Sequence, residues 1–397
     1  MIPVLLEGWA VGQDDEVEDD GGLWGPGVAR RIAESKGVIK KCTEVGGHRY
    51  CIYKYRYVSF IDFVRDPYAA LARGTVVIDG ERVVVPFTKF FNWWEIPGLD
   101  PSLLGPAKGS YVKLDGTMVA AWIDPYTGDL RANTRGLLWN MAPGHKRVLV
   151  DDDGRVLNPF VKGLLHYARE NSLLEDLEEI AGRGVAVFEL VVPGMPASGN
   201  VRNTKYAEMA EKKGVPYLLA VREDGVIRQP EMYEWPLKPE EVDPWEAASK
   251  DDMEGAVAWY ESIPLPPPLD SLSLDPLLKF KSRAYLLRVG AITGWRSIVA
   301  LAISGRLDDA LGLIPDPKER EALAELVELA GEVEEIVERG REKIMMYTIK
   351  PGSPVGALLE GGIKAVLAKH APKRPSEAVR WMRRFRSTLL KMVGEER

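Results

Sequence analysis

The sequence predicts a protein of the α+β class, with a mixed domain of strands and helices first and a mostly helical domain last. Three observations lead to this expectation. Short runs of β-branched and aromatic residues, separated by Asp-Gly and other turn signals, fill most of the chain up to about Ser282. After that point apolar residues recur at helical spacing. The chain has 397 residues, which allows two or three domains.

The strands and helices of the first domain follow from local patterns. A hairpin is predicted in TVVIDGERVVVPF around Asp79-Gly80, and a meander in SYVKLDGTMVAAWID around Asp115-Gly116. One helix is expected between Val161 and Ala181, and another at YAEMAEKKG. Further strands are predicted at RYCIYKYRYVSF, LRANTR, GVAVFELVV, VPYLLAVREDG and MEGAVAWYES.

Two segments of the first domain lack a regular pattern. Residues 1–35 contain an acidic run and a Gly-rich stretch, so they are expected to form a mobile or wrapping start. The proline-rich stretch at residues 263–276 is expected to be a connector without regular structure. In the last domain, helices are predicted at REALAELVELAGEVEEIVERGREKI, SPVGALLEGGIKAVLAKH and SEAVRWMRRFRSTLLKMV.

The composition excludes several classes of protein. Hydrophobic residues make up 46% and charged residues 28%, which is typical of a globular chain and not of a disordered, collagen-like or coiled-coil protein. No apolar run approaches the roughly 20 residues of a membrane span, and the first residues do not resemble a secretory signal. With two cysteines, a reducing, cytoplasmic location is the default expectation. Few Gln and Asn beside many Glu, Lys and Arg suggest a thermophilic source.

Charge is unevenly distributed along the chain. The net charge is −7, yet Arg283–Arg397 carries a net +4 and the remainder a net −11. Lys373–Lys391 holds seven basic residues and one acid, with Trp381 and Phe385 among them. Such a segment suits contact with an RNA backbone and bases, while a solvated face of a terminal helix remains an equal alternative.

The chemistry-bearing signal is a set of six short motifs in a fixed order. Lys113-Leu114-Asp115-Gly116 alone is weak evidence, because a lysine beside an Asp-Gly turn is usually a solvated hairpin residue. Around it stand Ala72-Arg73-Gly74 and KFFNWWE before the lysine, and FELV, EGAV and KFKS after it. This order resembles the covalent nucleotidyltransferases, and KFFNWWE and KFKSRAY are most similar to ATP-dependent RNA ligases of the T4 RNA ligase 1 type. The match covers about Ala72 to Tyr285.

The resemblance implies a fold and an activity. The fold would be a nucleotidyltransferase (ATP-grasp-like ligase) domain of antiparallel sheets with flanking helices at residues 1–282, followed by an all-α, RNA-binding C-terminal domain at residues 283–397. The activity would be ATP-dependent joining of RNA 5′-phosphate and 3′-hydroxyl ends through a lysyl-AMP and an adenylated RNA, with Mg²⁺ or Mn²⁺. RNA repair would be one such task.

The resemblance also assigns roles to residues. Lys113 would be the nucleophile, since a neutral amine can attack the α-phosphorus and hold AMP. Glu189 would accept a hydrogen bond from the ribose, and Glu254 would help place the metal. Lys279 and Lys281, on one face of a strand, would hold the α-phosphate. The remaining expected ATP or AMP contacts are Arg73, Lys89, Leu114, Asp115, Arg135 and Val257; Arg135 stands where the family has a lysine.

Other readings stay open at this stage. A DNA ligase or a capping guanylyltransferase shares the motifs, although both follow the last motif with a β-rich domain. A non-catalytic RNA-binding protein with a ligase-like fold is the alternative of another class. The histidines are scattered without zinc spacing, and Cys42 and Cys51 near His48 are read as structural. Residues 1–70 match no motif of the family, and the oligomeric state is not predicted.

Overall fold

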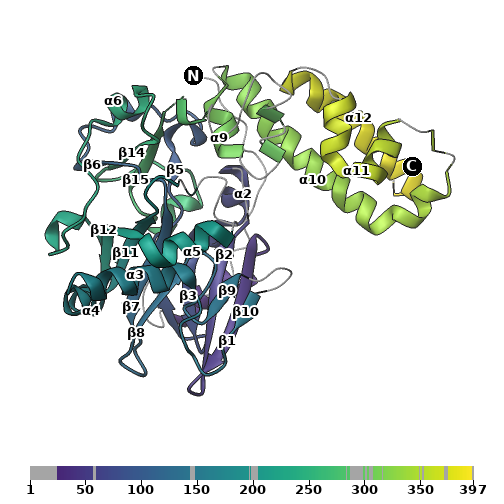
Figure 1. Cartoon of the computed structure of the whole chain (residues 1–397). Helices are drawn as coiled ribbons and strands as arrows, with labels where there is room; N and C mark the ends of the chain where they lie inside the picture. The colour runs from purple at the N-terminus through teal and green to yellow at the C-terminus, as the bar shows by residue number, and fades with distance from the viewer. Residues whose placement is uncertain are drawn as a thin grey trace.

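The structure is a computed structural model in which strands form the first part of the chain and helices the last. The helical part extends from one end of the strand-rich part (Figure 1). None of the described helices combines the length and the apolarity needed to cross a membrane. The description covers residues 25–56, 60–143, 148–195, 197, 204–282, 284–286, 298–299, 302–303, 307–314, 316–347, 349–350, 353–370 and 374–395.

The first sheet has the antiparallel order β1-β2-β3-β4. The predicted hairpin at Asp79-Gly80 is confirmed, because both residues have the positive φ that a tight turn between β3 and β4 requires. Cys42 and Cys51 face each other across β1 and β2 and form a disulfide, which agrees with their structural reading. The strands are β1 (Val38–Val45), β2 (His48–Tyr55), β3 (Arg73–Ile78) and β4 (Arg82–Val84).

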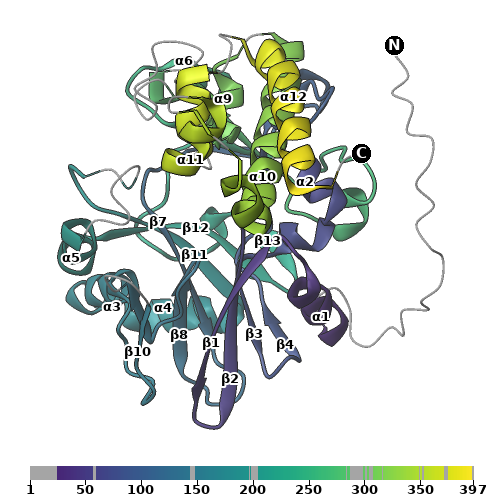
Figure 2. The same cartoon turned by 90° about the vertical axis from the view of Figure 1, so that its right-hand side faces the viewer.

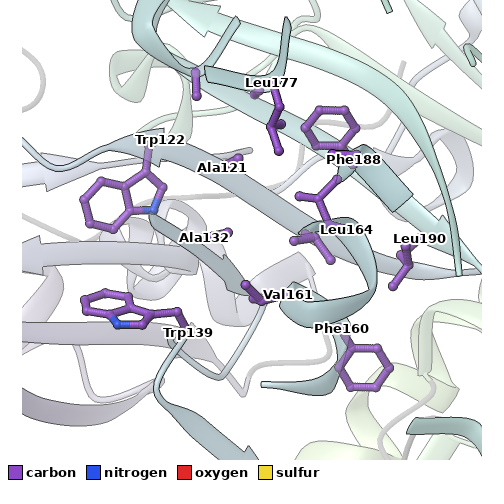
Figure 3. Close-up of a cluster of buried hydrophobic side chains, with 14 of the residues drawn as sticks. Ala121, Trp122, Ala132, Trp139, Phe160, Val161, Leu164, Leu177, Phe188 and Leu190 are labelled. Atoms are coloured by element: carbon purple, nitrogen blue, oxygen red, sulfur yellow. The ribbon is translucent and has the colours of Figure 1, made fainter. Parts of the chain in front are cut away.

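The second sheet holds the largest hydrophobic core. Its antiparallel order is β13-β12-β11-β7-β8. Helices α3 and α4 pack on it, and α5 packs against α3. Trp122, Trp139, Phe160, Leu164 and Phe188 belong to one cluster of buried side chains (Figure 3). The elements are β7 (Thr117–Ile123), β8 (Leu130–Thr134), β11 (Val185–Val191), β12 (Val215–Glu223), β13 (Val226–Arg228), α3 (Pro159–Glu170), α4 (Leu174–Arg183) and α5 (Thr204–Lys213).

The third sheet has the order β5-β15-β14-β6 and is antiparallel except for the short β5–β15 pair. Helix α6 packs against β14 and β15. The strands are β5 (Phe91–Asn92), β6 (Gly109–Val112), β14 (Gly255–Trp259) and β15 (Leu277–Lys281), and α6 is Pro244–Ser249. Smaller elements are α1 (Pro26–Glu34), α2 (Phe60–Arg65), β9 (Met141–Pro143), β10 (Val148–Val150), η1 (Pro67–Leu71), η2 (Trp93–Glu95), η3 (Pro101–Leu103), η4 (Pro230–Met232) and η5 (Leu269–Leu272).

Four sequence expectations need correction. β6 and β7 do not form a meander, because β6 pairs with β14 and β7 pairs with β8 and β11. The single helix expected over 161–181 is two helices, interrupted where Ser172 takes a positive φ. Within the expected irregular start, α1 begins at Pro26, a residue preset for the first helical turn. The 263–276 connector contains η5.

The α+β class is confirmed, and the helical part has its own core. Asp316 caps α10 by accepting a hydrogen bond from the Lys318 amide at 2.9 Å. Apolar residues of α10 pack on α12, and both helices lie above the strand-rich part in Figure 2. The helices are α9 (Leu307–Gly312), α10 (Pro317–Met345), α11 (Pro354–His370, kinked at Gly362) and α12 (Pro375–Val393).

Helix α12 carries most of the basic, aromatic-bearing segment. Phe385 is buried in the helical core and stacks on Trp381 at 5.3 Å, so the ring of Phe385 is not available to a base. Arg383 and Arg386 form ion pairs with Glu325 and Glu332 of α10. Much of this segment therefore stabilises the α10–α12 pair, and Lys373 lies outside the described residues.

Candidate active site

Lys113 lies where the chain crosses from the third sheet to the second. The Lys113 amide donates to the carbonyl of Gly255 at 2.9 Å, which continues the β6–β14 pairing. Three residues later the Gly116 amide donates to Glu189 Oε1 at 3.0 Å. A Cβ at Gly116 would lie 2.6 Å from the carbonyl oxygen of Leu190, so only glycine allows this close approach. The Asp-Gly pair therefore serves a crossing between sheets rather than a hairpin.

A cavity between the second and third sheets contains six of the eleven predicted site residues. Its charged members are Arg73, Lys113, Glu189 and Lys279, whereas most of its wall is apolar. Such a mostly apolar hollow with a few converging polar groups is typical of a small-molecule site. The lining residues are Arg73, Phe87, Phe90, Tyr111, Val112, Lys113, Leu114, Met118, Glu189, Leu219, Pro239, Val257, Trp259, Leu277 and Lys279.

Glu254 forms an ion pair with Lys113. Glu254 Oε1 lies 2.6 Å from Lys113 Nζ, and the carboxylate is almost fully buried. Its other oxygen, Oε2, is also buried and has no hydrogen-bond partner among the described residues. Gly255 holds this end of β14 close to β15, since a Cβ there would collide with the Phe280 carbonyl. An unsatisfied buried carboxylate oxygen indicates that a donor or a cation belongs there.

Glu189 lines the cavity from strand β11. Burial raises the pKa of Glu189 to about 7, and the charge of Glu254 acts in the same direction. Lys113, the Gly116 amide and Arg73 act in the opposite direction. A carboxyl group with a pKa near neutrality, inside a cavity, marks a candidate functional residue.

Two cations face the cavity around one aromatic ring. Arg73 Cζ lies 4.2 Å, and Lys279 Nζ 5.6 Å, from the centre of the Phe90 ring. Arg73 Nε and Nη1 are buried and make no hydrogen bond within the part of the chain that the structure describes. Burial lowers the pKa of Arg73. Desolvated guanidinium donors of this kind are suited to bind an anion such as phosphate.

The other predicted site residues lie outside this cavity. Lys89 Nζ pairs with the buried Glu95 at 3.3 Å and lies 4.7 Å from the centre of the Phe91 ring. Lys281 forms a buried ion pair with Asp309 of α9, so its ammonium contacts the helical part. Three more predicted residues do not line the cavity either. Asp115 follows Leu114 on the crossing segment, Arg135 packs on Tyr55, and Glu254 forms the ion pair with Lys113.

Sequence reasoning missed Tyr55, on which several of these cations converge. Burial alone would raise the pKa of Tyr55, but nearby positive charges outweigh burial and lower it to about 7. Arg135 has the largest such effect, and its guanidinium lies 4.4 Å from the ring centre. Lys89, Arg73 and Lys279 contribute as well. Nothing in the local sequence around Tyr55 predicts this convergence, because it depends on pairing between distant strands.

A metal site built by protein ligands alone is not found among the described residues, where no group of three or more His, Cys, Asp or Glu gathers. His48 instead pairs with Asp79 at 2.7 Å. Any divalent cation at Glu254 would have to complete its coordination with substrate oxygens and water, which is common for Mg²⁺.

No protein-family model matches the chain, and no curated protein matches it. The chain is similar to solved structures of ATP-dependent RNA ligases. Two forms of an archaeal ATP-dependent RNA ligase are 16% and 15% identical, with TM-scores of 0.39 and 0.38. The alignments cover 74% and 90% of this chain, and 73% and 94% of those chains.

A mutant RNA ligase of Naegleria gruberi with AMP and Mn is 15% identical, with a TM-score of 0.32. That alignment covers 51% of this chain and 58% of the Naegleria chain, so this protein spans little more than half of that ligase. Identities this low and TM-scores below 0.5 leave the activity to be inferred from the cavity itself.

Proposed function

We propose that the protein is an ATP-dependent RNA ligase that joins 5′-phosphate and 3′-hydroxyl ends through an AMP held on Lys113. The observation that carries this proposal is the set of charged residues that Lys113 pairs with or shares the cavity with. The Lys113 amine lies 2.6 Å from the buried Glu254, and Lys113 lines a mostly apolar cavity together with Glu189, Arg73 and Lys279.

The first step would form the lysyl-AMP. Neutral Lys113 Nζ attacks the α-phosphorus of ATP, an N–P bond forms, and the bond from that phosphorus to the pyrophosphate oxygen breaks. The amine must lose its proton, and Glu254 Oε1 is within proton-transfer distance at 2.6 Å. Because the chemistry needs positioning and charge neutralisation above all, the fixed walls of the cavity suit it.

The cavity divides into parts that match the parts of a nucleotide. Its apolar walls, including Val257 and Leu277, suit the faces of a purine. Glu189 would accept a hydrogen bond from a ribose hydroxyl. Arg73, with its two buried nitrogens, and Lys279 would neutralise phosphate charge.

The residues present fit a divalent cation. Glu254 Oε2 is buried and makes no hydrogen bond within the described residues, and an anionic oxygen is the ligand that Mg²⁺ or Mn²⁺ prefers. Glu189 is a second carboxylate near Glu254, since the charge of Glu254 raises the pKa of Glu189. A cation bound there would offset phosphate charge.

The later steps would use the same cavity. The AMP passes to the 5′-phosphate of RNA, which forms a 5′–5′ anhydride and frees Lys113. The acceptor 3′-hydroxyl then attacks the RNA phosphorus, the strand is sealed, and AMP leaves. We propose that residues 283–397 contribute RNA contacts, for which α12 still offers the exposed Arg380 and Arg384.

The test is strand sealing. A 5′-³²P-labelled, single-stranded RNA of about 20 nucleotides is incubated with ATP and Mg²⁺ and analysed by denaturing electrophoresis. The proposal predicts an adenylated RNA and a circular or joined product, both absent with Lys113→Ala. Joining of the matched DNA but not of the RNA would favour a DNA ligase. RNA binding without either product would favour the non-catalytic RNA-binding protein.

A further inference from the structure

A second hollow lies on the helix side of the second sheet, where α3 and α5 pack against each other (Figure 1). It has a volume of about 510 Å³. Three of its described residues carry a permanent positive charge and one a negative charge, in a chain whose net charge is −7. The hollow is therefore a local basic site on an acidic protein, and such a site attracts anions. It is lined by Val156, Lys162, Leu165, His166, Arg169, Glu211 and Lys212.

The basic groups of α3 repeat along one side of that helix. Lys162, His166 and Arg169 are four and three residues apart, the spacing that brings side chains onto one face. At about 1.5 Å of rise per residue, they extend over roughly 10 Å. Lys212 adds a further charge from the last turn of α5. Successive phosphates of one strand can contact groups spread over this length, whereas one isolated phosphate cannot.

The carboxylate of Glu211 does not neutralise the hollow. Glu211 Oε1 lies 3.5 Å from Lys162 Nζ, and the two side chains are 42% and 38% exposed. An ion pair this long and this exposed contributes little, because water competes for both charges. Lys162 can therefore exchange Glu211 for a phosphate.

The hollow and Lys113 approach the same edge of the second sheet, where β11 ends and β7 and β12 begin. An added Cβ at Gly116, in the segment that follows Lys113, would lie 2.6 Å from the Leu190 carbonyl oxygen. An added Cβ at Gly214, which follows α5, would lie 2.9 Å from Leu190 Cγ. Lys212 is two residues before Gly214. Leu190 is thus the common neighbour of the Lys113 segment and of the end of α5.

We infer that this hollow binds the sugar–phosphate backbone of the RNA strand whose end lies at Lys113. The strand would pass round the edge of the sheet, because the cavity and the helices lie on its two faces. Lys162, Arg169 and Lys212 would neutralise successive phosphates, without reading the bases. His166 would add a hydrogen bond from its ring. This inference rests on the proposed function, and it adds an RNA contact in the first domain to those proposed for the helical part.

The test measures RNA binding as a function of salt, without ATP so that no joining occurs. Fluorescence anisotropy of a 5′-phosphorylated, single-stranded RNA of about 20 nucleotides gives the Kd between about 50 and 200 mM salt. Each lost phosphate contact should lower the slope of log Kd against log salt by about 0.7, and weaken binding about fivefold at about 0.1 M salt. We expect this from Lys212→Ala. The double variant Arg169→Ala with Lys212→Ala should show about twice that slope change and about 25-fold weaker binding.

Lys213 provides a matched control. It is exposed, like Lys212, and lies in the same last turn of α5, so both lysines interact with the same end of the helix dipole. However, Lys213 is not among the described residues that line the hollow. Lys213→Ala should therefore keep the slope and the Kd of the wild type. A partly unfolded variant would lose binding amplitude at every salt concentration without a change of slope, so the slope isolates a lost contact.

The outcomes separate the inference from the function on which it rests. Equal slope changes in Lys212→Ala and Lys213→Ala, or a wild-type slope in the double variant, would overturn the assignment of the hollow. If a poly-glutamate peptide bound more tightly than the RNA and lost that affinity in Lys212→Ala, the occupant would be an acidic protein, and the assignment to RNA would be overturned. Transfer of label from α-³²P-ATP to Lys113 needs no RNA. Wild-type protein that shows these slopes but takes no label would therefore overturn the ligase proposal and retain the hollow as an RNA-binding site.

Discussion

Removing the Asp275 carboxylate should destabilise the wall of the cavity. Asp275 accepts from Arg222 Nη2 at 2.7 and 2.9 Å, and from the Thr88 amide at 2.8 Å. Arg222 also donates to the Val85 carbonyl at 2.9 Å. This network joins β12 and the start of β15 to the segment 85–90, which carries the cavity rings Phe87 and Phe90. Both charged side chains are about 95% buried or more.

The expected magnitude follows from that burial. Removing one partner of a buried ion pair costs about 3–5 kcal/mol, because the other charge stays in a poorly solvated place. We therefore expect Asp275→Ala to lower the free energy of unfolding by about 3 kcal/mol or more, measured by urea denaturation with tryptophan fluorescence. The KM for ATP should rise as well, because the segment that carries the Phe90 ring loses its hydrogen bond to Asp275.

An exposed pair provides the control. Arg155 Nη2 lies 2.6 Å from Asp153 Oδ2, but the two side chains are 71% and 77% exposed. Asp153→Ala should change the free energy of unfolding by about 0.5 kcal/mol or less. If Asp275→Ala cost no more than this control, the reasoning from burial would be refuted.

Three further predictions concern the charged groups. Glu254→Gln should slow AMP transfer by about 100-fold or more, measured by label incorporation, because an amide takes no proton from Lys113. As the pH rises from 6 to 8, the KM for ATP should fall around pH 7, because ionised Glu189 accepts more strongly, and Glu189→Gln should lack that inflection. Asp309→Ala removes the carboxylate paired with Lys281, so calorimetry should show a lower Tm; an unchanged Tm would contradict a stabilising role.

The sequence was informative where the chemistry is encoded in order and spacing. The succession of KLDG, FELV, EGAV and KFKS led to Lys113, Glu189, Glu254 and Lys279, and the structure brings these four together. Strands and long helices with a clear apolar period, such as α10, were also predicted correctly.

The missed features all depend on contacts between distant segments. Asp115-Gly116 has the local signature of a hairpin, yet Gly116 is needed for close approach to Leu190 on another strand. The Asp275 carboxylate and its Arg222 partner are 53 residues apart, and no local pattern pairs them. Lys281 has the expected position on its strand, but its ammonium lies against Asp309, which only the docking of α9 could reveal.

The most direct test of the central claim is whether Lys113 becomes covalently linked to AMP. Protein purified free of bound nucleotide is incubated with α-³²P-ATP and Mg²⁺, denatured, and separated by electrophoresis, for wild type and Lys113→Ala. A labelled band in the wild type that is absent in the variant, with the AMP mass located on the peptide that contains Lys113, is the predicted result. Label that persists in Lys113→Ala, or no label in the wild type with any nucleotide, would contradict the account.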